Sequence, residues 1–300
     1  MARGVSEGNL LPAAFGELIA NASIEIAPRA CADIKAVADV LPVNTCIYVP
    51  APAQRPLSET LDAVAAIRRA GLDPVPHIAA RRFANRAELA GFLAALVGEH
   101  GVHRVLLIAG DEAQPRGPFA DSLQVLEAGV LSKAGVREVG IAGYPEGHGR
   151  IATQALEAAF TAKRKQALSQ GLGIYVVTQF SFSTTRIAAF CAELARRAPE
   201  VPVYVGMAGP TDPIKLMRYA QICGVSASLR AMRNLGAGMV GLATHTDPQE
   251  QLMALAHHTD GLNNGRSTNN VVGIHLYSFG GALATARWLY DRLHDRLHKA

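Results

Sequence analysis

The chain is poor in cysteine and in aromatic residues, and it carries little net charge for its length. Its 300 residues include four cysteines, at positions 31, 46, 191 and 223, and 6% aromatic residues. No two cysteines are spaced C-x-x-C, and the ten histidines form no H-E-x-x-H. These absences exclude the common sequence patterns of zinc sites, so we expect no bound metal. We interpret the cysteines as buried thiols of a protein in a reducing compartment.

The chain also lacks a concentrated basic stripe and any long apolar stretch. Lys and Arg number 29, and Asp and Glu number 25, which leaves a net charge of +4. This charge is too small and too dispersed to predict nucleic-acid binding. No apolar run approaches the roughly 18 residues of a membrane-spanning helix, and residues 1–12 carry no secretory leader pattern. We therefore expect a cytoplasmic protein without nucleic-acid or membrane partners.

Short apolar runs and helical patterns alternate about eight times along the chain. The runs are four to six residues long, rich in β-branched side chains and almost continuously apolar, as in strands buried on both faces of a parallel sheet. They occupy residues 23–26, 45–49, 74–78, 105–109, 138–142, 173–178, 201–205 and 272–277.

Amphipathic segments follow several of these runs. We predict helices over residues 57–70, 88–100, 122–134, 151–169 and 282–297. Ser58 is the expected N-cap of the first, and Gly71, Gly101 and Gly135 are expected to end the first three.

Eight β-then-α units predict an α/β protein, specifically a (β/α)8 (TIM) barrel. An open doubly wound sheet is the alternative, and the absence of G-x-G-x-x-G after the first run weakens it. Residues 223–270 are too many for one connection, which predicts extra helices between the seventh and eighth strands. We expect an N-terminal extension over residues 1–20 and one barrel domain over residues 21–300.

Polar or aromatic side chains stand where most of the predicted strands end, which is where barrel enzymes place their active sites. These positions are Glu25, Tyr48, His77, Gly110-Asp111, Tyr144 to His148, Gln179 and Tyr277.

Each of these side chains also has a structural interpretation. Glu25 could form an internal ion pair, Asp111 could cap a helix, and His77 could bond a neighbouring carbonyl. Glu25 lies between Ile24 and Ile26, however, and a carboxyl buried in an apolar strand has the raised pKa of a general acid. Neither G-x-S-x-G nor G-x-x-x-x-G-K-[ST] occurs. The residues therefore indicate a barrel enzyme with a carboxylate acid.

The residues resemble those of the methylenetetrahydrofolate reductases. Residues 142–148 read AGYPEGH and match that family's AGYPEGHP loop, and this motif is the specific one. Residues 23–29 resemble its opening SFEFFPP strand, and residues 177–182 its ITQFFF strand. Gly110-Asp111, His77-Ile78 and residues 273–277 resemble its RGD, HLT and HFYT segments. These blocks follow the family order from about Ile24 to Tyr277.

The resemblance implies an oxidoreductase of one-carbon metabolism and methionine biosynthesis. It implies interconversion of 5,10-methylenetetrahydrofolate and 5-methyltetrahydrofolate with hydride from NADH or NADPH, relayed in the family by FAD. Glu25 is then the general acid and Asp111 a second catalytic carboxylate, while Gln179 and Tyr277 bind the folate. The implied flavin-site residues are Tyr48, His77, Gly110, Asp111, Tyr144, His148 and Lys165. Family members are often oligomers, so we also expect a homo-oligomer.

Several positions depart from the family pattern, and most of them belong to the flavin site. Ala109 replaces the Arg before Gly-Asp, the TYGA-like segment after the second strand lacks its Thr and Gly, and Ser278 to Gly281 lack the family's Asn-Arg pair. We therefore expect FAD binding to be weakened, altered or absent. Without FAD, NADH or NADPH would pass hydride directly to the folate, and Arg81, Arg82 or Arg116 would anchor its phosphates.

Two other functions remain open. A non-catalytic barrel could bind folate and act as regulator or partner of another one-carbon enzyme, although such a protein needs no acid. A folate-linked methyltransferase or carbon-bond lyase is a third interpretation, but no thiolate cluster offers it a zinc or corrinoid site.

Overall fold

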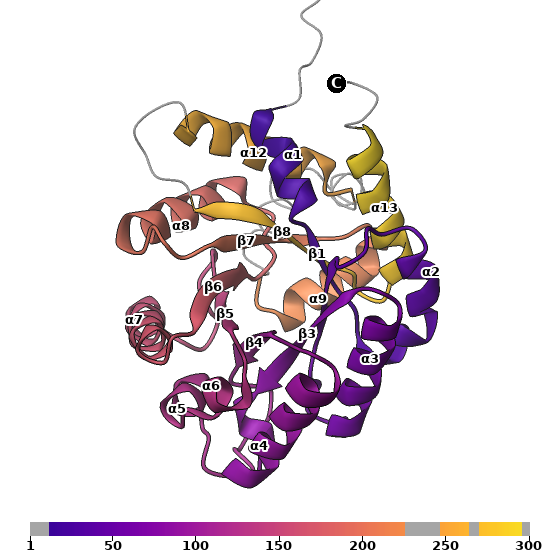
Figure 1. Cartoon of the computed structure of the whole chain (residues 1–300). Helices are drawn as coiled ribbons and strands as arrows, with labels where there is room; N and C mark the ends of the chain where they lie inside the picture. The colour runs from indigo at the N-terminus through magenta and orange to yellow at the C-terminus, as the bar shows by residue number, and fades with distance from the viewer. Residues whose placement is uncertain (1–11, 226–246, 264–269, 296–300) are drawn as a thin grey trace, which may run out of the picture.

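The chain folds into a closed barrel of eight parallel strands surrounded by helices (Figure 1). The structure is a computed structural model that describes residues 12–225, 247–263 and 270–295. The strands follow one another around the barrel in chain order, and β1 closes the ring by pairing with β8. The predicted (β/α)8 barrel is therefore confirmed, and the doubly wound alternative is excluded.

All eight strands coincide with the predicted apolar runs. The largest change is at the seventh, which begins two residues later than predicted and extends to Ala208. The strands are β1 Ser23–Glu25, β2 Cys46–Val49, β3 Asp73–Ala79, β4 Arg104–Ile108, β5 Glu138–Gly143, β6 Gly173–Thr178, β7 Val203–Ala208 and β8 Val271–Tyr277.

The helices form the outer layer around the strands (Figure 1). They are α1 Ala13–Ala20, α2 Ile34–Ala38, α3 Leu57–Arg69, α4 Arg86–Ala94, α5 Ser122–Glu127, α6 Val130–Ala134, α7 Thr153–Ser169, α8 Thr184–Arg197, α9 Pro213–Ile222, α12 Gln249–Asn263 and α13 Ala282–Asp295. Shorter turns occupy η1 Pro28–Asp33, η2 Ala80–Arg82 and η3 Ala95–Glu99.

Two predicted helix details are wrong. Ser58 is not an N-cap, because α3 already begins at Leu57 and Pro56 occupies the cap position. The segment 122–134 is not one helix, because Gly129 adopts a left-handed φ of 65° and separates α5 from α6. Gly71, Gly101 and Gly135 follow their helices with positive φ, as predicted.

The connection between β7 and β8 contains α9 and α12, which confirms the prediction of extra helices there. The rest of this connection, residues 226–246 and 264–269, lies outside the described residues. α1, within the segment expected to be an extension, packs against α12 and β8. Its Phe15, Leu18 and Ile19 are buried in the same core as the outward-facing residues of the strands. Burial of these apolar side chains stabilises the packing of α1 against the barrel.

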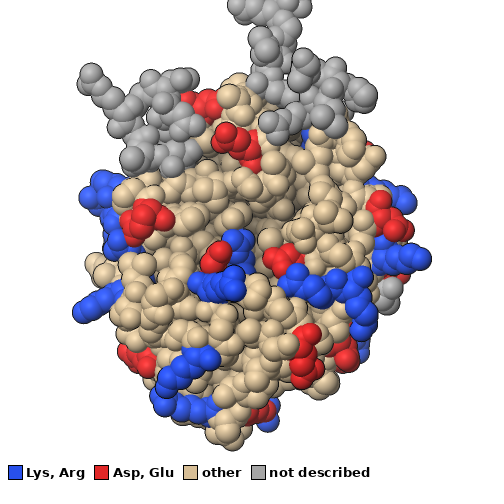
Figure 2. Space-filling view, in the orientation of Figure 1, with Lys and Arg blue, Asp and Glu red and all other residues tan. Residues whose placement is uncertain are grey.

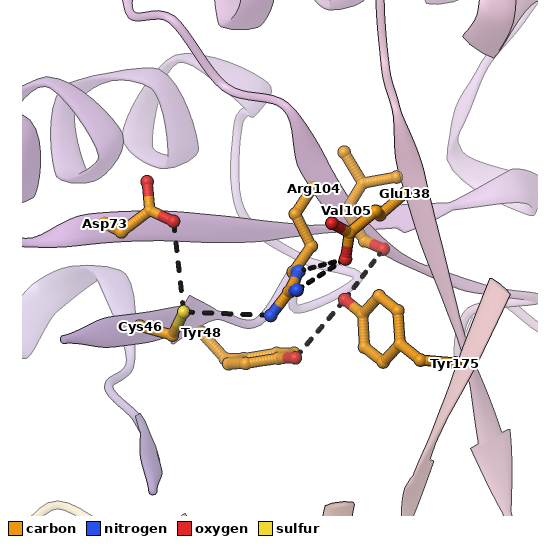
Figure 3. A network of polar contacts seen from close by, with 7 residues as sticks. All are labelled: Cys46, Tyr48, Asp73, Arg104, Val105, Glu138 and Tyr175. Atoms are coloured by element: carbon orange, nitrogen blue, oxygen red, sulfur yellow. Dashed lines mark hydrogen bonds and ion pairs between the residues drawn. The ribbon is translucent and has the colours of Figure 1, made fainter. Parts of the chain in front are cut away.

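The amino-terminal half of the barrel interior is filled by a polar network, which we call the lower network (Figure 3). Arg104 Nε donates to Glu138 Oε2 at 2.8 Å, and its guanidinium lies 4.9 Å from the ring centre of Tyr175. The thiol of Cys46 lies 3.9 Å from both Arg104 Nη1 and Asp73 Oδ2. These charged residues and Cys46 are the first residues of their strands. Paired charges at this end of a barrel are expected to serve stability, because active sites form at the opposite end.

The surface carries both signs of charge. On the face drawn in Figure 2, basic and acidic side chains of the described residues are interspersed around a broad uncharged area. Among the described helices, none combines the length and the hydropathy that crossing a bilayer requires.

Candidate active site

Glu25 is the last residue of β1 and turns its side chain into the barrel at the carboxyl ends of the strands, which we call the mouth. Its neighbours Ile24 and Ile26 face outward and are fully buried in the core. The backbone carbonyl of Glu25 accepts a hydrogen bond of 2.6 Å from Ser278 Oγ. Its side chain is 23% exposed, and burial raises the pKa of the carboxyl to about 7. Glu25 can therefore hold a proton at neutral pH and release it.

His77 faces Glu25 from the opposite side of β2. The two side chains approach to 3.6 Å between His77 Nε2 and Glu25 Oε2. Burial lowers the pKa of His77 to about 3, so the imidazole is neutral. Among the described residues, no lysine or arginine forms an ion pair with Glu25. The carboxyl thus lies beside a neutral ring and is not held ionised by a cation.

His275 lies one layer below the mouth, on β8. Its Nδ1 is 2.9 Å from Ser23 Oγ, and its ring packs edge-on against Tyr48 and Tyr277. Burial lowers the pKa of His275 to about 3, with a smaller contribution from His77. The Nε2 atoms of both histidines are buried without a hydrogen-bond partner among the described residues.

Tyr48 does not present its hydroxyl to the mouth. The side chain is 1% exposed, and its hydroxyl donates to the hydroxyl of Tyr175 at 3.2 Å. Tyr175 in turn donates to the carbonyl of Val105 (Figure 3). Tyr48 therefore belongs to the lower network, and the structure does not place it where the resemblance implies a cofactor contact.

Five aromatic side chains pack together beside the mouth, and Phe180 is buried at their centre. Tyr277 packs against Phe180, with ring centres 5.6 Å apart, and stacks on Phe279 at 6.1 Å. Tyr219 of α9 also stacks on Phe279, at 4.6 Å, and Phe182 packs against Phe180. We call these five residues the aromatic wall. Aromatic rings favour stacking against flat ligands.

Only Tyr277 of the aromatic wall was predicted as a site residue. Its hydroxyl donates to the carbonyl of Thr178 at 3.0 Å, so its ring face is what remains for a ligand. Phe279 adopts a left-handed φ of 47°, which is rare for a residue other than glycine. Phe180 and Phe182 lie within the ITQFFF-like run, and that run was the available signal for this wall.

Gly206 makes room for Tyr277. A Cβ built on Gly206 would lie 2.1 Å from the carbonyl oxygen of Thr178 and 2.9 Å from the Tyr277 ring. Its backbone N–H donates to Thr178 Oγ1 at 2.8 Å. A larger residue would therefore displace either β6 or the ring.

Gly110 and Asp111 follow β4 at the mouth. Gly110 has a φ of 100°, and a Cβ there would lie 2.6 Å from Glu112 Oε2. The side chain of Glu112 folds back beneath Gly110 and pairs with the buried Arg82 at 3.4 Å. Asp111 is exposed, and its charge raises the pKa of Tyr144 and of the thiol of Cys223. Asp111 therefore faces the same mouth as Glu25.

The AGYPEGH loop forms another side of the mouth. Tyr144 and His148 pack edge to face with ring centres 5.0 Å apart. Glu146 accepts a hydrogen bond of 2.6 Å from Ser181 Oγ, which ties this loop to the one after β6. Burial lowers the pKa of His148, assisted by the charge of Arg150. The structure thus places Tyr144 and His148 in contact within this loop, and their role in a flavin site stays a prediction.

Gln179 and Cys223 meet at the mouth. A side-chain hydrogen bond from Gln179 lowers the pKa of the Cys223 thiol, but burial is the larger effect and raises that pKa to about 11. Glu25 and Asp111 also raise it through their charges. Cys223 was interpreted only as a structural thiol, because the long connection after β7 concealed its place at the end of α9.

Lys165 is not brought to the mouth. It is exposed on α7, about 18 Å along the axis from the start of that helix at 1.5 Å per residue.

Arg81 and Arg116 brace the loops after β3 and β4. Arg81 Nε donates to the carbonyl of Ala120 at 2.7 Å, and Arg116 Nη1 donates to the carbonyl of Arg82 at 3.2 Å.

These placements test whether the residues fit FAD as the resemblance implies. Tyr48 is engaged in the lower network, Lys165 lies on the outer layer, and His77 faces Glu25. Ala109 offers no partner for a carbonyl or phosphate, and the buried pair of Glu112 and Arg82 lies beneath Gly110. The described residues therefore do not fit the flavin in that manner. Among the described residues, no group of three or more His, Cys, Asp or Glu side chains is arranged to hold a metal ion.

Comparison with known proteins gives structural likenesses at low identity. No family model matches the chain. Dihydropteroate synthase from Thermus thermophilus superposes with a TM-score of 0.49 at 14% identity, covering 93% of this chain and 94% of the synthase. Sialic acid aldolase from Ruminococcus gnavus gives a TM-score of 0.42 at 13% identity, covering 91% of this chain and 98% of the aldolase. At these values neither likeness bears on the activity of this chain.

Proposed function

We propose that the chain reduces 5,10-methylenetetrahydrofolate to 5-methyltetrahydrofolate with hydride taken directly from NADH or NADPH. The observation that carries this proposal is Glu25, a mostly buried carboxyl with a pKa of about 7 that faces a mouth walled by aromatic rings. The matching AGYPEGH loop and Gln179 lie around the same mouth. The chemistry of the mouth thus supports what the sequence resemblance implies.

Glu25 acts as the general acid. Its proton goes to the leaving nitrogen of the methylene bridge, and the bond between that nitrogen and the methylene carbon breaks. The remaining nitrogen and carbon form an iminium cation, which accepts hydride from C4 of the dihydronicotinamide and becomes a methyl group. Glu25, now ionised, takes a proton from water, so each turnover consumes one hydride and one proton. General acid catalysis of this kind contributes about 10²–10⁴-fold.

The other residues bind and orient the reactants. The carboxylate of Asp111 favours the cationic iminium electrostatically. The aromatic wall packs against the flat pterin and nicotinamide rings. Gln179 offers an amide to the folate in place of its contact with Cys223. No step passes through FAD, because Tyr48 and Lys165 lie away from the mouth and Ala109 offers the flavin no polar side chain.

The first experiment compares Glu25→Gln with the wild-type chain. We expect turnover of methylenetetrahydrofolate to fall by about 10²–10⁴-fold while folate binding, measured by calorimetry, stays within a few-fold. Wild-type turnover should also fall as the pH rises through about 7, because the acid proton is then lost. Glu127→Gln makes the same chemical change on the exposed face of α5 and serves as the matched control.

The alternatives are separate outcomes of this experiment. Folate binding without any oxidation of NADH or NADPH would favour a non-catalytic folate-binding barrel. Full turnover by Glu25→Gln would contradict the acid role. An absorbance spectrum of the purified protein, with turnover measured before and after rigorous flavin removal, tests direct transfer, since strict dependence on FAD would contradict it.

A further inference from the structure

The contact between Glu25 and His77 joins two strands that are not neighbours in the sheet. β2 separates β1 from β3, yet Glu25 Oε2 lies 3.6 Å from His77 Nε2 because both side chains point into the barrel. The His77 side chain is 8% exposed, and its Nε2 is buried without a hydrogen-bond partner among the described residues. The approach of 3.6 Å therefore places one ring nitrogen of His77 directly against the Glu25 carboxyl.

Among the described residues, no lysine or arginine pairs with Glu25. The described titratable residues that face the mouth or lie just beneath it come from β2, β8, the end of α9 and two loops, and they are Tyr48, His275, Tyr277, Cys223, Asp111, Tyr144, Glu146 and His148. Burial keeps the phenols, the thiol and His275 neutral at neutral pH. His77 is therefore the neutral donor that directly faces the carboxyl.

We propose that His77 is a positioning residue for Glu25, whose Nε2–H donates to one carboxyl oxygen and leaves the acid proton on the other oxygen, facing the mouth. The inference rests on the acid role proposed for Glu25. When Glu25 gives up its proton, the new carboxylate already faces a donor. The separation of 3.6 Å is just outside hydrogen-bonding distance, and catalytic contacts of this kind tighten as charge develops.

A neutral donor suits this task better than a cation. A lysine or an imidazolium at 3.6 Å would hold Glu25 ionised and remove the acid proton before substrate arrives. Burial lowers the pKa of His77 to about 3, so the ring can donate a hydrogen bond without donating a full charge. This role differs from the flavin contact that the resemblance implies for His77, and the two make different predictions.

The test measures the protonation of Glu25 in the ligand-free chain. Difference infrared spectroscopy follows the C=O stretching band of the protonated carboxyl from about pH 5 to about pH 9, on both sides of the pKa of about 7. The band is assigned to Glu25 if it is absent from the Glu25→Gln protein. His77→Met removes the donor, and the midpoint of the band should move up by about one pH unit, because a hydrogen bond to the charged form has been lost. His77→Gln keeps an N–H at the position of Nε2, and its midpoint should stay close to that of the wild type.

Tyr175→Phe is the matched control, because it removes a buried hydroxyl from the lower network and should leave the band unmoved. An unmoved midpoint in His77→Met, or equal shifts in His77→Met and His77→Gln, would overturn the proposal. If His77→Met fails to fold, the proposal is tested by the nitrogen-15 chemical shifts of His77 in the wild-type chain, which report the tautomer and the charge of the ring. The neutral Nε2–H tautomer is expected, and either the Nδ1–H tautomer or an imidazolium would overturn it.

Neither readout requires turnover, so the two proposals can fail separately. A shifted Glu25 band in a chain that does not reduce methylenetetrahydrofolate would preserve the pairing and remove the proposed reaction. Normal reduction with an unmoved band would preserve the reaction and remove the role of His77. Loss of flavin retention in His77→Met with an unmoved Glu25 band would assign His77 to a flavin contact instead.

Discussion

The two halves of the barrel interior treat their polar groups in opposite ways. In the lower network, Arg104 pairs with Glu138, the thiol of Cys46 contacts Asp73, and the hydroxyl of Tyr48 bonds to that of Tyr175 (Figure 3). At the mouth, Glu25 faces only neutral groups in its close contacts, and His77 and His275 each keep a buried nitrogen unpaired among the described residues. The polar side chains of the lower network thus bond to one another, whereas Glu25 and His77 face each other without a close hydrogen bond.

The polar groups that stabilise the fold therefore lie at one end of the barrel axis, and the groups of the proposed active site lie at the other end. A satisfied buried network loses stability when one partner is removed, because the other is left unpaired. A buried carboxyl without a cation lowers stability when it ionises, and its removal should therefore stabilise the fold. Substitutions in the two halves should thus change the free energy of unfolding with opposite signs.

The largest effect is expected from Arg104→Ala. The substitution leaves Glu138 and the thiol of Cys46 without their donor and removes the cation over Tyr175. Because Arg104 and Glu138 are partly exposed, we expect the free energy of unfolding to fall by about 3 kcal/mol, which is the lower end of the range for broken buried pairs. Urea unfolding at neutral pH measures it. A change below about 0.5 kcal/mol would show that the lower network does not carry stability.

Glu25→Gln should show the opposite sign. The folded pKa of about 7 lies above the ordinary value of 4.5, so the contribution of Glu25 to stability is full below about pH 4.5 and is lost as the pH rises through 7. The free energy of unfolding of the wild type should fall relative to Glu25→Gln by up to about 3 kcal/mol between about pH 5 and about pH 8. Parallel pH profiles of the two proteins would contradict the burial of an uncompensated carboxyl.

Phe279→Ala should weaken binding more than folding. The ring stacks on Tyr219 and on Tyr277 beside the mouth, and its loss removes the packing that holds the Tyr277 ring in place for a flat ligand, worth about 0.5–1.5 kcal/mol. We expect the KM for methylenetetrahydrofolate or the nicotinamide to rise by up to about tenfold, with kcat within a few-fold. Phe279→Gly is the matched variant, since it also relieves the positive φ and should be the more stable of the two.

The smallest effect is expected from Tyr48→Phe. The substitution removes one buried hydrogen bond to Tyr175 and should cost about 1 kcal/mol of stability. Because the hydroxyl lies in the lower network, the KM for NADH or NADPH should not change. A raised KM with unchanged stability would place Tyr48 in the cofactor site after all.

The strands and the acid could be predicted from the sequence because each depends on local pattern. Apolar runs of strand length marked all eight strands of the barrel, and Glu25 stood out as a carboxyl between two isoleucines. Tyr48 could not be placed in the same way. Strand position fixes the level of its Cα, but the direction in which a long inward side chain leans depends on the partners across the barrel.

Other features of the mouth depend on contacts that sequence order conceals. The approach of His77 to Glu25 crosses the barrel interior past β2, so no spacing along the chain predicts it. The aromatic wall depends on the left-handed turn at Phe279, and Cys223 reaches the mouth from the end of α9. The resemblance implies Lys165 as a flavin-site residue, but its height along α7 places it away from the strand ends.

The most direct test of the central claim follows a labelled hydride. Methylenetetrahydrofolate is incubated with flavin-free protein and, in parallel samples, NADH or NADPH deuterated at the transferred C4 position, and the methyl group of the product is analysed by mass spectrometry. Direct transfer at the mouth predicts one deuterium per methyl group at full enrichment with at least one of the two nucleotides, and a rate lower by about 10²–10⁴-fold for Glu25→Gln. Absence of product, or a methyl group carrying hydrogen from solvent instead of deuterium, would contradict the account.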